Sequence, residues 1–393
     1  MLRHMLSALL ALLPLPGVAT AAGPSPPLLL AHLMPWYEAP PTAGWGWHWT
    51  MNHYRPDSVA IGHRPIASRF YPVIGPYHSG DEHVIEYQLL LMRLAGIDGV
   101  ILDWYGHVEH LDYGVIHRNS ERIVAAANRL GMKVAVCYED RTLATLEAAG
   151  KLAGDREAHV AAEIEWLAKA WFPLECYVRL DGKPLLLSFG HEGLDDAGWQ
   201  RARARAGTPV AYVGQQHLRP GAAGGFDWPV PKRGLETIAT FAAQSQSWPM
   251  RIPVAFPRFA DIYAQAGVHE SWGSITDDDG KTFKTSLAKA FAMQPPVIQL
   301  ATWNDWGEGT VLEPSTEFGT RDLELLQAVR RRYVDPAFTP RAADLGLPQR
   351  LLELRRRPDA ATFALRLDDA AALLARGDAA GGRAILDAIP PPP

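Results

Sequence analysis

The chain has 393 residues, enough for one large domain with an appendage or for two domains. Its hydrophobic content of 48% and its charged content of 21% are ordinary for a soluble globular protein. The net charge of −5 provides no basic surface of the kind that binds nucleic acid, so we expect no nucleic-acid partner.

The N-terminus has the pattern of a cleavable secretory signal peptide. Arg3 and His4 precede an apolar run, Met5–Leu15, and Ala19–Ala21 fits a small-x-small cleavage site. The run is too short for a transmembrane helix, and no other stretch is long and apolar enough for one. We therefore expect residues 1–21 to be removed and the mature protein to be periplasmic or extracellular, without a membrane span.

Short apolar runs alternate with helical stretches from residue 28 to about residue 335. Eight strands are expected, at Leu28–Met34, Gly99–Trp104, Lys133–Tyr138, Pro184–Phe189, Pro209–Val213, Phe226–Val230, Ile252–Phe256 and Pro296–Leu300. The helices expected between and after them end or begin at turn residues, and span 81–94, 119–130, 156–171, 197–206, 235–247, 286–293 and 322–333. Continuous apolar strands that alternate with helices indicate a parallel sheet covered by helices. Eight such units favour a (β/α)₈ TIM barrel over an open doubly wound sheet.

A tryptophan-rich stretch, Trp45–His53, follows the first strand and has neither helical nor strand periodicity. It fits a binding loop and a hydrophobic plug at the bottom of the domain equally well. Beyond Asp335 the chain becomes punctuated by prolines and then helical again. We therefore expect a barrel domain over residues 22–339 and a small C-terminal helical appendage over residues 340–393.

The strongest chemical signal is the stretch Ala301–Pro314, which reads ATWNDWGEGTVLEP and follows the last expected strand. It places Asp305 and Glu308 three residues apart. A chain turn near Gly307 would bring both carboxylates into one cleft, because glycine tolerates backbone angles that other residues avoid. Cleavage of a glycosidic bond needs two such acids, one to protonate the leaving oxygen and one to act as base or nucleophile. The alternative is a surface turn with solvated acids and core tryptophans.

Other polar and aromatic residues also follow the expected strands. They include Trp36, Tyr37, Asp103, Trp104, Tyr105, Glu139, Arg258 and Asn304. In a barrel, the carboxyl ends of the strands form one face, and active sites lie there. This placement favours a catalytic Asp305–Glu308 pair over a solvated turn.

Five segments resemble the glycoside hydrolase family 71/99-like group. They are His32–Tyr37 (HLMPWY), Ile74–Ser79 (IGPYHS), Asp98–Gly106 (DGVILDWYG), Tyr138–Glu139 and, above all, Trp303–Thr310 (WNDWGEGT). The resemblance implies a (β/α)₈ barrel that acts on α-linked glycans. Family 99 contains endo-α-mannosidases with an ExxE pair, and family 71 contains fungal α-1,3-glucanases with a DxxE pair. Asp305 follows the family 71 pattern, whereas Gly309, Thr310, Glu313 and Pro314 look more like family 99.

We expect Glu308 to be the general acid, because a carboxyl beside Trp306 and other apolar walls should have a raised pKa. Asp305 would be the base and take a proton from water or from the sugar. The expected substrate-binding residues are Trp36, Tyr37, Trp104, Tyr105, Glu139, Arg258, Trp303, Asn304 and Trp306. The aromatic members could stack on sugar faces, with core packing as the alternative. For Glu139 and Arg258 the alternative is a structural ion pair.

No HExxH motif and no Cys-plus-His spacing is present, so we expect no metal and no cofactor. Cys137 and Cys176 are interpreted as two buried thiols, although an exported protein could bridge them.

The expected function is a secreted glycoside hydrolase that is endo-acting on α-linked glycans, of the α-mannan or the α-1,3-glucan type. Its partner would be an oligo- or polysaccharide, and the sequence names no protein partner. Two other functions stay open. One is a non-catalytic glycan-binding barrel whose acids merely hold hydroxyls, and the other is a polysaccharide-assembly factor that works through the C-terminal helices.

Overall fold

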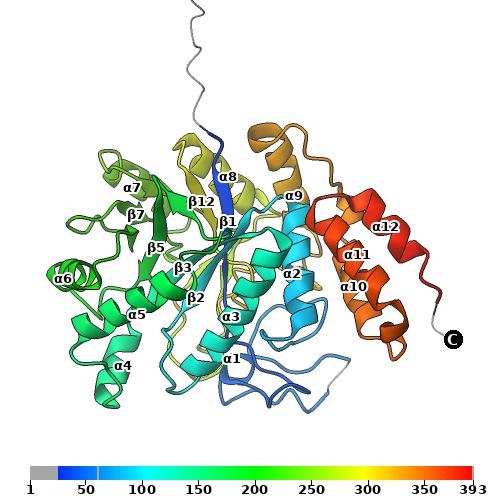
Figure 1. The fold of residues 1–393 in the computed structure, drawn as a ribbon, viewed down its shortest axis with the longest axis horizontal. Helices are drawn as coiled ribbons and strands as arrows, with labels where there is room; N and C mark the ends of the chain where they lie inside the picture. Colours follow the sequence, from blue (N-terminus) through cyan, green and yellow to red (C-terminus); the bar gives the residue numbers. More distant parts are fainter. Residues whose placement is uncertain (1–24, 60–61, 392–393) are drawn as a thin grey trace, which may run out of the picture.

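Nine parallel strands form the barrel at the centre of the protein (Figure 1). The structure is a computed structural model and describes residues 25–59 and 62–391. The strands are β1 (Leu28–Leu33), β2 (Gly99–Trp104), β3 (Lys133–Glu139), β5 (Lys183–Phe189), β6 (Ala211–Gln215), β7 (Gly224–Phe226), β8 (Arg251–Ile252), β9 (Val254–Ala255) and β12 (Val297–Leu300). Their order in the sheet is β8-β7-β6-β5-β3-β2-β1-β12-β9. The predicted signal peptide, residues 1–21, lies outside the described residues.

β8 and β9 are two halves of one strand position, and together they close the barrel. β8 pairs with β7, and β9 pairs with β12, both in parallel register. Pro253 separates the halves, because proline has no N–H to donate to a sheet ladder. Its carbonyl still accepts the backbone N–H of Gln299 at 3.1 Å. With the two halves counted once, the barrel has eight strand positions, and the predicted (β/α)₈ fold is confirmed.

Helices cover the outside of the barrel. In chain order they are α2 (Glu82–Ala95), α3 (Tyr113–Leu130), α4 (Thr142–Ala148), α5 (Arg156–Ala170), α6 (Asp196–Ala206), α7 (Glu236–Gln244), α8 (Lys281–Ala292) and α9 (Arg321–Val329), which runs into a π-helical turn at Arg330–Val334. The limits of α2 follow its sequence signals. At its start, the Asp81 carboxylate accepts the N–H of His83. At its end, Gly96 has a left-handed backbone, at φ 88°, and terminates the helix. α3 begins well before the predicted Asn119. Its N-cap residue is Asp112, whose side chain makes no capping hydrogen bond, and Gly114 in its first turn weakens the local helix signal.

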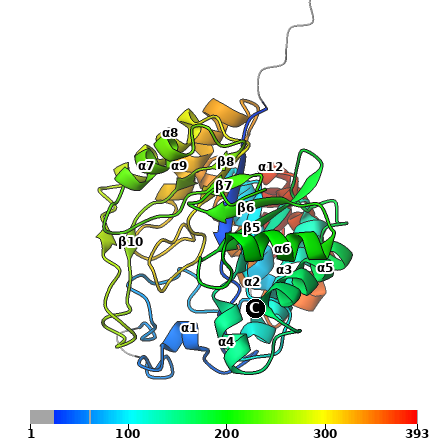
Figure 2. The same ribbon diagram turned by 90° about the vertical axis from the view of Figure 1, so that its left-hand side faces the viewer.

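Three shorter elements lie outside this pattern. β4 (Arg179–Leu180) pairs antiparallel with β5, and β10 (Phe259–Ala260) pairs antiparallel with β11 (Ser274–Ile275). The single-turn helix α1 (Trp47–Thr50) lies at the carboxyl end of β1 (Figure 1). Figure 2 shows the connection around β10 reaching the same end of the barrel as α1. Residues of both connections meet there, because Met51 and Ala67 pack against Ile262 and Ala266.

The C-terminal helices pack against α2 and its neighbours (Figure 1). They are α10 (Leu347–Arg355), α11 (Ala364–Ala375) and α12 (Ala379–Asp387). One 3₁₀ turn, Ala342–Asp344, precedes α10, and another, Ala360–Phe363, lies between α10 and α11. Leu351 and Leu367 are buried in the same apolar cluster as the core residues of α2. The Arg355 guanidinium binds the buried Glu86 carboxylate of α2 at 3.0 Å. The appendage therefore shares its core with the barrel.

Alternate side chains of each strand point into the barrel or out toward the helices. In β2, for example, Ile101 belongs to the inner cluster, whereas Val100 and Leu102 pack with the helices. Cys137 and Cys176 are both buried free thiols, as predicted. Within the ranges that the structure describes, no helix is both long and apolar enough to cross a membrane.

Candidate active site

A cavity of about 140 Å³ opens at the carboxyl ends of the barrel strands. It is lined by His32, Met34, Trp36, Asp103, Tyr105, Glu139, Arg141, Phe189, Trp228, Tyr263, Asp305 and Glu308. Five of these were predicted as site residues from the sequence: Trp36, Tyr105, Glu139, Asp305 and Glu308. The cavity thus brings together both predicted catalytic carboxylates and part of the predicted aromatic wall.

A turn that follows β12 presents the two carboxylates. The backbone N–H of Asp305 donates to Thr302 Oγ1 at 2.8 Å, and Asp305 Oδ1 accepts the N–H of Glu308 at 3.0 Å. The glycine with a left-handed backbone is Gly309, at φ 67°, and not the predicted Gly307. A Cβ at Gly309 would lie 2.7 Å from the carbonyl oxygen of Ala260, so this position needs glycine on two grounds.

Burial raises the pKa of both Asp305 and Glu308, and it raises that of Glu308 further. It raises the pKa of Asp305 to about 6, and N–H groups of Glu308 and Gly307 that bind the carboxylate oppose the rise. Burial also raises the pKa of Glu308 well above its usual range, and the charge of Asp305 adds to the effect. Among the described residues, none donates a hydrogen bond to the Glu308 carboxylate. Glu308 therefore keeps its proton at a pH where Asp305 has released its own, which is the order that an acid–base pair needs.

Two further acids line the cavity at neighbouring strand ends. Burial raises the pKa of Asp103 to about 8, with the charge of Asp305 as a second cause, and it raises that of Glu139 well above its usual range. Glu139 Oε1 and Trp36 Nε1 are buried, and no described residue binds either atom. Buried polar atoms normally have hydrogen-bond partners, so the cavity has unused donors and acceptors for a ligand rich in hydroxyl groups.

Tyr37, Asn304 and Trp306 were predicted to bind substrate, but they are buried and instead hold the turn that carries Asp305 and Glu308. The Asn304 side chain bridges to β1, since its Oδ1 accepts the N–H of Met34 at 2.8 Å and its Nδ2 donates to the Met34 carbonyl at 3.0 Å. The Tyr37 hydroxyl donates to the Asn304 carbonyl at 3.0 Å and accepts the Trp306 N–H at 2.9 Å. These bonds fix the backbone on both sides of Asp305.

The Tyr77 hydroxyl is a second anchor for the same turn. It donates to Glu313 Oε2 at 2.6 Å and accepts from Asn304 Nδ2 at 3.1 Å and Trp306 Nε1 at 3.3 Å. Gln88 of α2 donates to the other carboxylate oxygen of Glu313 at 3.0 Å. Burial raises the pKa of Glu313 to about 7, although these hydrogen bonds oppose the rise. A chain of buried polar groups thus connects α2 to the turn that carries Asp305 and Glu308.

Trp104, Trp303 and Arg258 do not line the cavity, contrary to the prediction that they bind substrate. Trp104 follows Asp103 on β2 and therefore points to the opposite face, where it packs among the helices. Trp303 is fully buried in that same outer cluster. Arg258 is buried and forms ion pairs with Asp277 and Asp322. Core packing and a structural ion pair, the alternatives that the sequence left open, describe these three residues.

Several lining residues were absent from the predicted site. Asp103 carried a usable signal, because it ends an apolar strand in the DWYG segment. Tyr263 carried none, since it lies in the irregular connection between β10 and β11 and reaches the cavity only through the tertiary fold. The tryptophan-rich stretch also contributes to this end of the barrel, because His48 stacks on Trp36 at 4.2 Å. That position rules out a plug at the amino-terminal bottom of the barrel.

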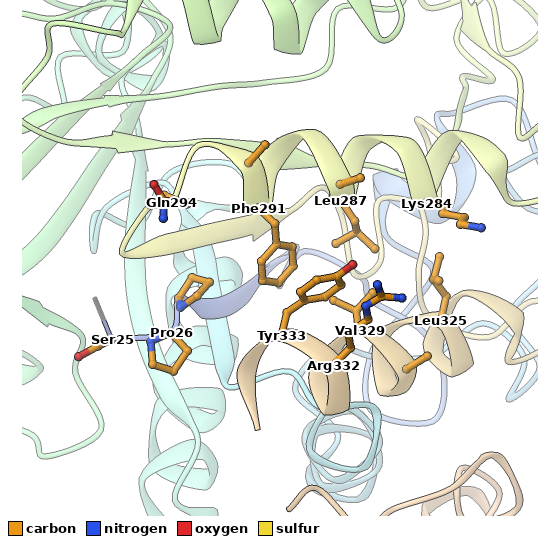
Figure 3. Close-up of a pocket in the computed structure, with 15 residues that line it drawn as sticks. Ser25, Pro26, Lys284, Leu287, Phe291, Gln294, Leu325, Val329, Arg332 and Tyr333 are labelled. Carbon is orange, nitrogen blue, oxygen red and sulfur yellow. The ribbon is translucent and has the colours of Figure 1, made fainter. Parts of the chain in front are cut away.

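A larger cavity of about 590 Å³ lies elsewhere, between α8 and the α9 region (Figure 3). Figure 3 shows Phe291 and Tyr333 facing each other across it, with Pro26 at one end. Pro26 precedes β1, and Gln294 precedes β12, so this cavity lies at the amino ends of the strands. No carboxylate belongs to its lining. Acid–base chemistry is therefore confined to the smaller cavity of these two.

No protein-family model matches the chain. In sequence, it is similar to a glycoprotein endo-alpha-1,2-mannosidase-like protein of Danio rerio, with 26% identity over 329 residues that cover 71% of this chain and 69% of the relative. It is also similar to the glycoprotein endo-alpha-1,2-mannosidase of Mus musculus, with 25% identity over 324 residues that cover 73% and 68%.

Among solved structures, the GH99 endo-alpha-mannosidase from Bacteroides thetaiotaomicron superposes with a TM-score of 0.57 at 18% identity, over 77% of this chain and 97% of that one. A glycoside hydrolase-like protein superposes with a TM-score of 0.54 at 16% identity, over 81% and 97%. These proteins support the family 99 part of the expected resemblance and give no specific support to family 71. The chain is thus a sequence relative of the endo-alpha-1,2-mannosidases and has the barrel fold of the GH99 endo-alpha-mannosidases.

Proposed function

We propose that this protein is an endo-acting glycoside hydrolase that cleaves α-linked mannose glycans. The predicted enzyme class, a glycoside hydrolase acting on α-linkages, is confirmed by the endo-alpha-1,2-mannosidase relatives. That the sugar is mannose, rather than the glucose of an α-1,3-glucan, is the finer part of the proposal. It is supported by the names of the same relatives.

The acid–base pair in the small cavity carries the proposal. Glu308, whose pKa burial raises well above its usual range, would give its proton to the glycosidic oxygen as the bond from that oxygen to the anomeric carbon breaks. Asp305, whose pKa lies at about 6, would take a proton from the nucleophile. That nucleophile is either water or a hydroxyl group of the sugar itself. The unpartnered Glu139 Oε1 and Trp36 Nε1 would bind sugar hydroxyls beside the cleaved bond.

Hydrolysis by wild-type protein, Glu308→Gln and Glu353→Gln is the direct test. Each would be incubated with α-mannans and α-1,3-glucans, and released oligosaccharides would be followed by mass. Glu353 is exposed on α10, so its variant controls for the loss of one carboxylate far from the cavity. We expect internal fragments of α-mannan from wild type and from Glu353→Gln only.

Three other results would change the proposal. Release of glucan fragments alone would move the substrate to α-1,3-glucan. Product from Glu308→Gln at the wild-type rate would refute the role of that residue. Binding of α-mannan without any product, from wild type as well, would favour a non-catalytic glycan-binding barrel.

We also propose that the protein is exported and cleaved after Ala21, on the strength of the N-terminal sequence pattern. The mass of the protein recovered from the periplasm or medium would test this. A mature chain that begins at Ala22 is the expected result, and an intact N-terminus in the cytoplasm would refute it.

A further inference from the structure

Two rows of aromatic rings lead outward from the walls of the small cavity. The first row begins at Trp36, on which His48 stacks with ring centroids 4.2 Å apart and planes 8° apart. Trp47 meets His48 edge-on at 5.0 Å. Trp47 is 39% exposed, so this row starts in the cavity wall and ends at the surface.

The second row comes from the connection between β10 and β11. It begins at Tyr263 in the cavity wall, continues to His269 at 4.5 Å, and ends at Trp272, 4.6 Å beyond His269. Trp272 is 49% exposed. Both rows thus have the same construction: a ring in the cavity wall, a histidine in the middle, and a half-exposed tryptophan at the outer end.

Backbone hydrogen bonds hold the second row against the turn that carries Asp305 and Glu308. The N–H of Ala260 donates to the Glu308 carbonyl at 2.8 Å, and the N–H of Ile262 donates to the Gly307 carbonyl at 3.0 Å. The buried Asp261 carboxylate then accepts the N–H of Trp272 at 2.8 Å. The same carboxylate accepts the Ser271 hydroxyl at 2.9 Å. The exposed tryptophan is therefore tied through two short steps to the backbone that carries Glu308.

The size of the cavity requires such outer contacts. Its volume of about 140 Å³ is well below the roughly 300 Å³ at which pockets for drug-sized ligands begin. It can enclose about one sugar ring, so the other units of a glycan must lie outside it. A flat tryptophan face with a polar N–H edge is suited to stack on the apolar face of a sugar.

We propose that Trp47 and Trp272 are outer sugar-binding platforms, which hold glycan units beyond the one in the cavity. The inference rests on the proposed function and deepens it, because it makes the enzyme one that selects its substrate by chain length. The ligand class is an α-linked oligosaccharide longer than a disaccharide.

The test uses α-linked manno-oligosaccharides from the disaccharide to the hexasaccharide. Trp47→Ala and Trp272→Ala would be compared with wild type, with the conservative Phe variants at both positions, and with Tyr333→Ala as a control. Tyr333 is a 54% exposed aromatic residue in the cavity at the opposite end of the barrel. kcat and KM would be measured for each chain length, and the dissociation constant would be measured in the Glu308→Gln background.

We expect each Ala variant to raise KM for the hexasaccharide about threefold to tenfold, at nearly unchanged kcat, because one stacking contact is lost. The disaccharide should show no change, the Phe variants should retain most of the affinity, and Tyr333→Ala should behave as wild type. An equal effect on short and long substrates, or no effect greater than that of Tyr333→Ala, would overturn the proposal.

The two levels of inference fail in different ways. If wild type cleaves none of the glycans, the proposed hydrolase function is wrong. The dissociation constants measured with the Glu308→Gln protein still test whether Trp47 and Trp272 bind sugar units. A length-dependent affinity that falls in Trp47→Ala and Trp272→Ala supports this role. Affinity that does not depend on length, or no binding of any member of the series, overturns it.

Discussion

Replacement of Tyr77 by Phe removes one hydroxyl group that joins three parts of the site. That hydroxyl donates to Glu313 at 2.6 Å and accepts from Asn304 and Trp306 at 3.1 and 3.3 Å. The last two residues flank Asp305 in sequence, so the loss reaches the catalytic turn directly. The benzene ring of phenylalanine preserves the packing, and only the hydrogen bonds are lost.

The size of the effect follows from what each partner retains. A hydrogen bond to a charged group contributes about 1.5–3 kcal/mol, and a buried group left without a partner costs about 1–3 kcal/mol. Glu313 keeps its bond from Gln88, and Asn304 keeps its bond to Met34, so the loss at both residues is partial. We therefore expect the free energy of unfolding to fall by about 2–4 kcal/mol. We expect kcat to fall about tenfold to a hundredfold, because small displacements of catalytic groups are costly.

Urea denaturation and steady-state kinetics on the substrate identified for wild type would measure these two quantities. Tyr333→Phe is the matched control, since Tyr333 is 54% exposed and its hydroxyl group makes no hydrogen bond to other described residues. A Tyr77→Phe protein within about 0.5 kcal/mol of wild-type stability would refute the reasoning about the network. A normal kcat in a destabilised protein would refute its role in positioning the turn.

Two predictions concern pH. The rate should rise through about pH 6 as Asp305 ionises to become the base, and it should fall at higher pH as Glu308 loses the proton it must donate. A profile of kcat/KM against pH without the acidic limb would contradict the assignment of Asp305 as the base. The pH dependence of stability should come in part from Asp103, whose pKa is raised from 3.8 to about 8. Between these two values the folded state binds more protons than the unfolded state, so the free energy of unfolding falls as pH rises. Asp103→Asn should remove about 4 kcal/mol of the loss between roughly pH 5 and pH 8. Urea denaturation at both pH values would measure this, and an unchanged slope would show that this group does not titrate as described.

The barrel could be predicted because its strands carry local signals. Parallel strands covered on both sides are continuous apolar runs, and seven of the eight runs expected in this sequence cover most of a barrel strand. The eighth, expected at Phe226–Val230, overlaps β7 only at Phe226. Helix limits followed where a residue such as Asp81 or Gly96 marked them. α4 was missed, because its seven residues have no capping side chain at the start and no apolar period long enough to detect.

The site could be predicted only in part, because strand ends show which residues share a face but not which way each side chain points. Asp305 and Glu308 were found by their spacing and their place after a strand. Trp104 was misassigned, because it and Asp103 are adjacent and only one of two neighbours on a strand can face the cavity. Trp306 is aromatic and beside the acids, yet its indole donates to Tyr77 inside the core. Such partners come from distant segments that no local pattern connects.

The C-terminal helices bear on the alternative of a polysaccharide-assembly factor, for which a deletion of residues 340–393 is the simplest experiment. Their proline-marked boundary suggests an appendage, but Leu351 and Leu367 share an apolar core with α2. Arg355 is also the cation closest to the buried Glu86 carboxylate. Deletion would expose the apolar face of α2 and remove that ion pair, which is strongly destabilising when one buried partner is lost. A loss of function after deletion would therefore not distinguish a binding surface from a structural support. Substitution of outer residues such as Leu365, which is 81% exposed, leaves the shared core intact and does distinguish them.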